Sequence, residues 1–262
     1  MARVSPKSVP GTHETTERLV MAVKWKMARW AAWAPGLTDS ESWLRWLAAP
    51  FPLPADGKPA LAAMPAMMRR RLDPLGRVAL ETAYTCQADD DACPVVLASR
   101  HGEVGRSLVL LDSLVSEGQV SPTSFSLSVH NAIGALYSIA RHDVHPYSAI
   151  AAGDETVEAA FVEAGGLLAD GAPAVMVVVY DEPLPVRYQA FADRVTFPRG
   201  WACRLEATDT GGLSLRTCVA GQERVADGVL PPDLAVLAFL LSDRPTYTRR
   251  VGTRQWQWCR HD

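Results

Sequence analysis

The chain has 262 residues, of which 48% are hydrophobic, which is enough to build a substantial core. Its formal net charge is −3, so it lacks the basic excess typical of nucleic-acid-binding domains. No uncharged apolar run approaches the roughly 20 residues that cross a bilayer, and the N-terminus has no apolar segment typical of a signal peptide. The five cysteines form no CxxC pair, which favours reduced thiols. We expect a cytoplasmic globular protein with no nucleic-acid partner and no membrane span.

Residues 1–18 are rich in proline, threonine and charge, and we expect them to form a flexible tail. The following residues alternate between apolar and charged side chains up to Trp33, as a strand does. Thr38 or Asp39 can cap the next helix, which would bury tryptophans on its apolar face. Further along, the patterns predict a proline-rich loop at 50–59, a helical region at 64–84 interrupted at Pro74, a buried strand at 94–99, and helices at 104–117 and 123–141.

The stretch SAIAAGDETVEAAFVEAGG begins as a short apolar strand, turns at Gly153 and continues as an alanine-rich helix from about Thr156. Residues 172–180 form a second buried apolar run, typical of a parallel strand. Strands that alternate with helices predict an α/β fold with a mostly parallel mixed sheet and helices on both faces.

The sequence pattern changes in the C-terminal third of the chain. Two alternating runs at 203–209 and 213–220, joined by Thr210-Gly211-Gly212, predict an antiparallel β-hairpin on one edge of the sheet. A last helix at about 232–241 precedes a basic, aromatic tail at 246–262. We therefore expect a single domain over residues 19–245.

The histidines do not indicate a metal or catalytic site. His142 and His145 stand in a loop beside Pro146, without the rigid helical face that makes a histidine pair a good ligand set. His130 lies in the predicted helix 123–141, where a hydrogen-bonded, partly buried side chain is the simpler interpretation. No G-x-S-x-G elbow frames a serine, and the dinucleotide-binding glycine fingerprint is incomplete. We expect no metal ion and no cofactor.

The turn at Gly153 is a place where an enzyme can hold a nucleophile, because the N–H groups at a helix N-terminus stabilise a developing negative charge. The apex here is Gly153-Asp154-Glu155, which contains no Cys, Ser or Lys. Asp154 and Glu155 could serve as a carboxylate pair in acid/base chemistry. Acidic residues in a first helical turn are also the ordinary complement to the helix dipole, and we favour this capping role.

Three segments together resemble the N-terminal half of β-ketoacyl synthases, the condensing enzymes of fatty-acid and polyketide assembly. They are RRRLDPLGRVALETA at 69–83, the stretch 95–140 with its Ser-Pro-Thr and Val-His-Asn sequences, and the elbow at 148–166. The resemblance covers about residues 20–185 and implies the N-terminal half of a thiolase-like fold.

Two departures from this family bear on activity. The nucleophilic cysteine of the family would fall at or beside Gly153, but no cysteine lies between Cys93 and Cys203. The two catalytic histidines of the family belong to a second half that cannot fit in the residues after 185. The resemblance therefore implies a shortened, chain-length-factor-like subunit of the aryl polyene type. Such a subunit would form a heterodimer with a full-length β-ketoacyl synthase and meet acyl carrier protein through that partner.

We prefer the hypothesis of a non-catalytic subunit whose helix 123–141 contributes to the interface and to the wall of the acyl tunnel. Phe125, Val129, Ile133 and Tyr137 are the candidates, because their spacing places them on one stripe, although such a stripe is also typical of a plain core. The alternative is an active condensing or malonyl-carrier-protein-decarboxylating enzyme that uses Asp154, Glu155 or Ser148. A third hypothesis is a hydrolase or small-molecule binder on the same half-thiolase scaffold.

Overall fold

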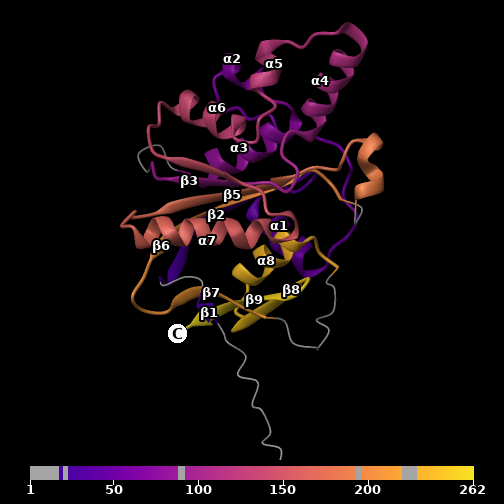
Figure 1. The fold of residues 1–262 in the computed structure, drawn as a ribbon. Helices are drawn as coiled ribbons and strands as arrows, with labels where there is room; N and C mark the ends of the chain where they lie inside the picture. The colour runs from indigo at the N-terminus through magenta and orange to yellow at the C-terminus, as the bar shows by residue number, and fades with distance from the viewer. Residues whose placement is uncertain (1–17, 20–22, 88–91, 193–195, 220–228) are drawn as a thin grey trace, which may run out of the picture.

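A computed structural model describes residues 18–19, 23–87, 92–192, 196–219 and 229–262, so the predicted tail at 1–18 lies almost wholly outside the described residues. Within these described residues the sheet contains nine strands, eight of them in the order β4-β3-β5-β6-β2-β7-β9-β8, and β1 pairs separately with β7 (Figure 1). The strands are β1 (Arg18–Leu19), β2 (Trp25–Trp33), β3 (Val95–Ala98), β4 (Tyr147–Ile150), β5 (Val175–Asp181), β6 (Arg199–Ala207), β7 (Gly212–Val219), β8 (Thr246–Val251) and β9 (Arg254–His261).

The helices lie on both faces of this sheet (Figure 1). They are α1 (Ser40–Ala48), α2 (Ala66–Arg69), α3 (Pro74–Cys86), α4 (Val104–Glu117), α5 (Pro122–Ser126), α6 (Ala132–Arg141), α7 (Thr156–Ala169) and α8 (Pro232–Leu240), with 3-10 turns η1 (Gly153–Glu155) and η2 (Val186–Phe191). Among the described helices none is long and apolar enough to cross a membrane.

Three parallel strands form the part of the sheet that positions the candidate site. β3 lies between β4 and β5 and runs parallel to both, while β6 continues the sheet antiparallel to β5. All four residues of β3 and the first six of β5 are buried, which explains why both strands have continuous apolar sequences. The predicted α/β fold with a mixed sheet is confirmed. The prediction that the sheet is mostly parallel is wrong, because among the described strands only β3–β4 and β3–β5 pair in parallel and the other pairings are antiparallel.

Two hydrophobic cores lie on opposite faces of the sheet. One contains residues of α3 and α6, including Leu80 and Ile133. The other contains residues of α1, α7 and α8, and the far end of the sheet curls beneath α7 and α8 to close it (Figure 1). Trp258 of β9 thereby packs its ring against Phe161 of α7, with centroids 4.9 Å apart. A C-terminal strand is thus part of the main core.

Several local predictions are confirmed in detail. The side chain of Asp39 caps α1 by accepting a hydrogen bond from Ser42 N at 2.9 Å, and Trp43 and Trp46 are buried. The helical region at 64–84 is divided before Pro74, which occupies the first turn of α3. The buried helix at 232–241 is α8.

The predicted hairpin at 203–220 is wrong. Its two runs do form β6 and β7, but β2 lies between them and pairs with both. The turn carries the chain across the end of β2, and a Cβ on Gly212, whose φ is +88°, would lie 2.8 Å from Trp25 O. Alternation identifies a strand but not its partner, and the N-terminal strand provides the partner here.

A C-terminal hairpin does exist, in the segment predicted to be a tail. β8 and β9 pair antiparallel from Thr246↔Cys259 to Val251↔Arg254, and β9 also pairs with β7. Trp256 and Trp258 are buried, and the residues that alternate with them, Gln255, Gln257 and Cys259, are partly buried. This alternation of buried and partly buried residues belongs to a strand inside the sheet rather than to a tail.

The predicted helix 123–141 is divided. α5 ends at Ser126 and α6 begins at Ala132. The residues between them, LSVHN, are mostly poor helix formers. His130 in this segment packs on Gly102, and its Nε2 lies 3.1 Å from Ile150 O. These tertiary contacts replace the helical path, so the four candidate residues do not lie on one stripe.

Candidate functional site

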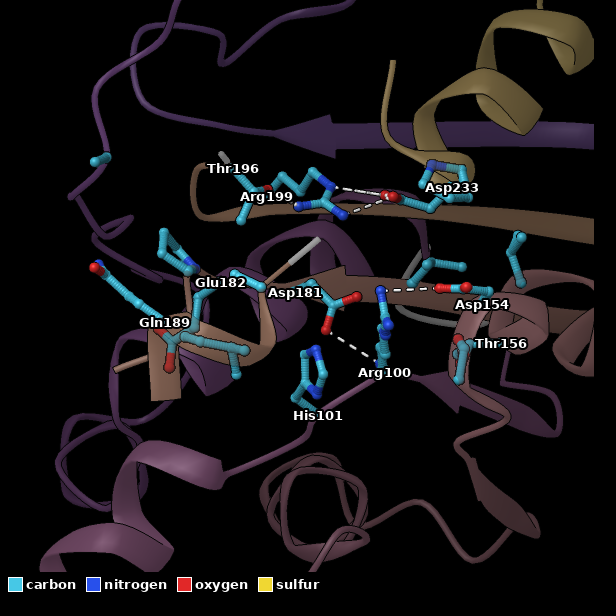
Figure 2. A pocket seen from close by; sticks show the side chains of 18 residues that line it. Arg100, His101, Asp154, Thr156, Asp181, Glu182, Gln189, Thr196, Arg199 and Asp233 are labelled. Carbon is cyan, nitrogen blue, oxygen red and sulfur yellow. Dashed lines mark hydrogen bonds and ion pairs between the residues drawn. The ribbon is translucent and has the colours of Figure 1, made fainter. Parts of the chain in front are cut away.

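A cavity of about 490 Å³ opens at the carboxyl ends of β3, β4 and β5. Each of the three strands is followed by residues that line it, namely Arg100 and His101 after β3, Gly153 and Asp154 after β4, and Asp181 and Glu182 around the end of β5 (Figure 2). In open α/β sheets, ligands bind outside the carboxyl ends of the strands. The cavity is therefore the candidate functional site.

The predicted strand, elbow and helix are present at the rim of this cavity. Thr156 shapes the elbow, because its Oγ1 accepts a hydrogen bond from Ala152 N at 3.0 Å and donates one to Gly153 O at 2.7 Å. Gly153 has φ +57°, and no atom lies within 4 Å of the place where a Cβ would stand. There is room for a side chain at the apex, but this backbone conformation disfavours any residue other than glycine.

Asp154 and Glu155 do not cap α7 in the predicted way. Within the described residues neither carboxylate accepts a hydrogen bond from the backbone of the helix. Asp154 Oδ1 instead lies 2.9 Å from a guanidinium nitrogen of Arg100. Glu155 accepts a hydrogen bond from Trp256 Nε1 at 2.8 Å and pairs with Arg254 at 3.2 Å. Their position still suits the helix dipole, but arginines hold both side chains.

The hairpin β8–β9 also reaches a buried acid in the first turn of α7. Glu158 is fully buried. Arg249 of β8 pairs with both its carboxylate oxygens, at 2.7 Å from Nε and 2.6 Å from Nη2, and Arg249 also donates to Asp154 O. We call Arg249, Arg254 and Trp256, together with Glu155 and Glu158, the hairpin clamp. This clamp ties the elbow and the start of α7 to β8 and β9.

A second buried ion pair forms part of the cavity wall. Arg199, at the start of β6, binds Asp233, in the first turn of α8, through Nε at 2.9 Å and Nη2 at 2.7 Å. Both side chains are nearly inaccessible to solvent. A bidentate pair of this kind fixes the geometry of the wall, because breaking it would leave a buried charge without compensation.

Two carboxyl groups in the cavity form no ion pair with an arginine that the structure describes. Asp181 Oδ1 accepts hydrogen bonds from Ser99 Oγ at 2.9 Å and Arg100 N at 3.1 Å, and burial raises the pKa of Asp181 to about 6. No described residue donates a hydrogen bond to Glu182. Burial, followed by repulsion from Glu103, raises the pKa of Glu182 to about 7. Raised carboxyl pKa values of this kind are typical of functional sites.

The structure separates the other residues that the sequence singled out. Ser148 donates a hydrogen bond to Glu163 at 2.8 Å. Phe125 and Val129 are exposed at 59% and 43%, whereas Ile133 and Tyr137 are buried in the core of the chain. The loop histidines His142 and His145 are exposed, and His130 is partly buried and hydrogen-bonded, as expected.

Sequence reasoning missed most of the charged residues of the cavity. Arg100, Asp181 and Glu182 come at the ends of the two apolar runs that were identified as buried strands. A charged residue directly after a buried parallel strand was therefore an available signal. The pairing of Arg249 with Glu158 joins residues 91 positions apart and left no local pattern to find.

Comparisons with known proteins agree with this fold. The protein family described as "Beta-ketoacyl synthase, N-terminal domain" matches residues 43–259, which extends the resemblance beyond the segments identified in the sequence. The comparison with curated protein sequences found no match.

Solved structures give the same result. A chain of the complex "Ketosynthase (ApeO) in Complex with its Chain Length Factor (ApeC)" from Xenorhabdus doucetiae is 27% identical, with a TM-score of 0.77, over 91% of this chain and 100% of that one. A chain of "The ishigamide ketosynthase/chain length factor" is 15% identical, with a TM-score of 0.58, over 75% of this chain and 67% of that one. A β-ketoacyl synthase from Burkholderia phymatum STM815 is 13% identical, with a TM-score of 0.54, over 71% of this chain and 60% of that one.

Proposed function

Because the chain belongs to the β-ketoacyl synthase N-terminal domain family, we propose that it is a non-catalytic subunit of the chain-length-factor type. In this role it pairs with an active, full-length ketosynthase in polyene or fatty-acyl biosynthesis, and helps to limit the pocket for the growing chain. Acyl carrier protein reaches the complex through the ketosynthase.

The observation that carries this proposal is the apex of the elbow. A condensing enzyme holds its acyl chain as a thioester on a thiolate activated at a helix N-terminus. Here the apex residue is Gly153, in a positive-φ conformation, and no cysteine lies between Cys93 and Cys203. The neighbouring acids Asp154 and Glu155 are held in ion pairs, which does not favour the alternative of an enzyme with an acidic elbow.

The extent of the structural match also supports a subunit of the chain-length-factor type. The matched chain of the ketosynthase and chain length factor complex is covered completely, so a protein of comparable extent occurs in such a complex. By contrast, about 60% of the β-ketoacyl synthase from Burkholderia phymatum is covered.

An open sheet edge beside the elbow is a suitable place for the ketosynthase. β4 is the terminal strand of the sheet, and its sequence YSAI contains neither a charged residue nor a proline to protect the edge. The loop after α5 contacts the end of this strand through His130 and Ile150. A partner that covers this edge would also meet Val129.

The helices α4 and α5 add an exposed apolar area. We call it the α4–α5 surface, and it comprises Val109, Leu111, Leu114, Val115, Phe125 and Val129. Only Leu110 of α4 is buried, so this helix packs weakly on its own chain. Apolar exposure on this scale marks interaction sites. In this proposal Phe125 and Val129 contact the partner or the acyl tunnel, while Ile133 and Tyr137 support them from the core.

Co-expression with a full-length ketosynthase from the same organism tests the proposal. We expect the two proteins to co-purify as a heterodimer. Phe125→Asp and Val129→Asp should weaken the complex, because each places a charge in an apolar interface. Val219→Asp is the matched control, since Val219 is also exposed but lies on β7, far from β4 in the sheet order. If wild-type chain and ketosynthase never co-purify, the proposal is wrong.

A further inference from the structure

We propose that the cavity at the elbow binds a small molecule that carries an ammonium group on an apolar body, through the carboxyl groups of Asp181 and Glu182. This binding site goes beyond the pairing function, because it needs only the residues of this chain. The cavity would therefore bind a ligand although this chain has no thiol at the apex of the elbow.

The charges that line the cavity determine the class of ligand. Six lining residues carry charge, and four of them neutralise one another as the pairs Arg100–Asp154 and Arg199–Asp233. Asp181 and Glu182 form no ion pair with a described residue, and Arg199, which lowers the pKa of Asp181, is itself paired with Asp233. At neutral pH the described part of the cavity therefore offers a surplus of negative charge. An added cation would compensate it, whereas an added carboxylate or phosphate would be repelled.

The two carboxyl groups are also placed to receive hydrogen bonds. Ser99 and the backbone N–H of Arg100 both bind Oδ1 of Asp181, which fixes the carboxyl group and leaves Oδ2 as an acceptor. Glu182 follows directly and lines the same cavity (Figure 2). An ammonium group has three N–H donors and no acceptor, so it can serve both side chains. Hydrogen bonds between two charged groups are stronger than neutral ones.

The rest of the lining suits an apolar body on the ligand. Apolar side chains from several elements face the cavity, namely Val157, Val179, Pro183, Leu184 and Pro232. A volume of about 490 Å³ lies within the usual range of small-molecule sites. The rim is held in place by the Arg100–Asp154 pair and, behind it, by the hairpin clamp, so the cavity is formed before any ligand binds.

The pH dependence of binding has a definite sign. Asp181 faces Ser99, the N–H of Arg100, Arg199 and Asp233, and Glu182 faces Glu103, Asp73 and Asp181. His101 is a further titratable group that lines the same cavity (Figure 2). Arg106 pairs with Asp73 and Glu103 rather than with Glu182. The two carboxyl pKa values are about 6 and about 7, while an alkylammonium stays charged in this range. Affinity should therefore increase from pH 5 to pH 8 as both carboxyl groups ionise.

Titration calorimetry with three probes tests the site on the full chain. Hexylammonium, hexanol and hexanoate share one apolar body and differ only in the head group. We expect hexylammonium to bind at least about tenfold more tightly than the other two at pH 8, which corresponds to one charged hydrogen bond. Equal affinity for hexanol would show an apolar cavity only, and tighter hexanoate binding would show an anion site. Either result overturns the proposal.

Variants assign the binding to the two carboxyl groups. Glu182→Gln should weaken hexylammonium binding about tenfold and reduce its pH dependence. Glu182 has no hydrogen-bond partner among the described residues, so this change should not disturb the fold. Asp181→Asn should also weaken binding, although it changes the contacts with Ser99 and Arg100. Glu117→Gln, at the exposed end of α4, is the matched control and should bind as wild type does. Unchanged binding in Glu182→Gln would contradict the assignment.

Discussion

The buried acids on the two sides of the elbow differ in whether they form ion pairs. On the hairpin side, Glu155 and Glu158 each pair with side chains from β8 or β9. Glu158 is fully buried, and its two carboxylate oxygens accept hydrogen bonds from Nε and Nη2 of Arg249. On the cavity side, Asp181 and Glu182 form no ion pair among the described residues, and burial raises their pKa values. Acids on the first side stabilise the fold, whereas those on the second side cost stability when they ionise. Buried acids that lower the stability of the fold and line a cavity are typical of a functional site.

The largest expected effect is on the hairpin side. Arg249→Met would leave Glu158 buried without a cation, and we expect it to lower the free energy of unfolding by about 3–5 kcal/mol. The double variant Arg249→Met/Glu158→Leu replaces the pair by apolar groups and should recover most of the loss. Urea denaturation measures both. Arg250→Met, on the exposed side of the same strand, is the control and should change stability by less than about 0.5 kcal/mol.

If Arg249→Met and Arg250→Met were equally stable, the hairpin clamp would not fix the elbow. The comparison between the two sides of the elbow would then fail. The double variant makes the result specific to charge, because a general loss of packing would not be reversed by a second substitution.

The cavity side predicts a smaller, pH-dependent effect. The folded pKa values of Asp181 and Glu182, about 6 and about 7, lie above those of the unfolded chain. The folded state therefore retains protons to higher pH, and these two groups lower the free energy of unfolding as pH rises from about 4 to about 8. At pH 8, Glu182→Gln should be more stable than wild type by about 1–2 kcal/mol, and the two should converge near pH 4.

Denaturation curves recorded across this pH range check that prediction. Glu117→Gln should run parallel to wild type, because its carboxylate is exposed. Hexylammonium should stabilise wild type at pH 8 and have little effect on Glu182→Gln. A Glu182→Gln curve parallel to that of wild type would mean that Glu182 ionises freely in the folded state.

The smallest effect concerns the exposed member of the hairpin clamp. The side chain of Arg254 is 54% accessible, so its pair with Glu155 is screened by solvent. Arg254→Ala should lower the free energy of unfolding by no more than about 1 kcal/mol, and less at high salt. The difference in free energy of unfolding between Arg249→Met and Arg254→Ala, measured under the same conditions, then compares a buried ion pair with an exposed one in the same clamp. A loss from Arg254→Ala as large as that from Arg249→Met would contradict this view.

Elements that depend on local pattern were predicted well. The capped helix α1, the break before Pro74, the buried strands β3 and β5 and the elbow at Gly153 all lie where the sequence placed them. Each rests on residues close in sequence, such as Asp39 with Ser42 or Thr156 with Gly153. The resemblance to the β-ketoacyl synthases also predicted the family and the fold, and the family match confirms the family.

Features that depend on distant partners were not predicted. The segment 246–262 carries the alternation of a strand, but only its pairing with β7 shows that it belongs to the main sheet. Likewise, the prediction of strands at β6 and β7 was correct, but the prediction that they pair with each other was wrong, because β2 lies between them. The prediction of one continuous helix at 123–141 was wrong for a similar reason, because His130 contacts Ile150 O, which is distant in the sequence.

The sequence by itself thus determined the local elements, the position of the elbow and the absence of a cysteine at its apex, because these follow from residue order over a few positions. Only the tertiary structure decided what the acids around the elbow do. Asp154 pairs with Arg100, which follows β3, and Glu155 and Glu158 pair with arginines of the C-terminal hairpin, whereas Asp181 and Glu182 form no ion pair with a described residue. Charge compensation depends on distance in space, and the sequence records no distance between residues 158 and 249.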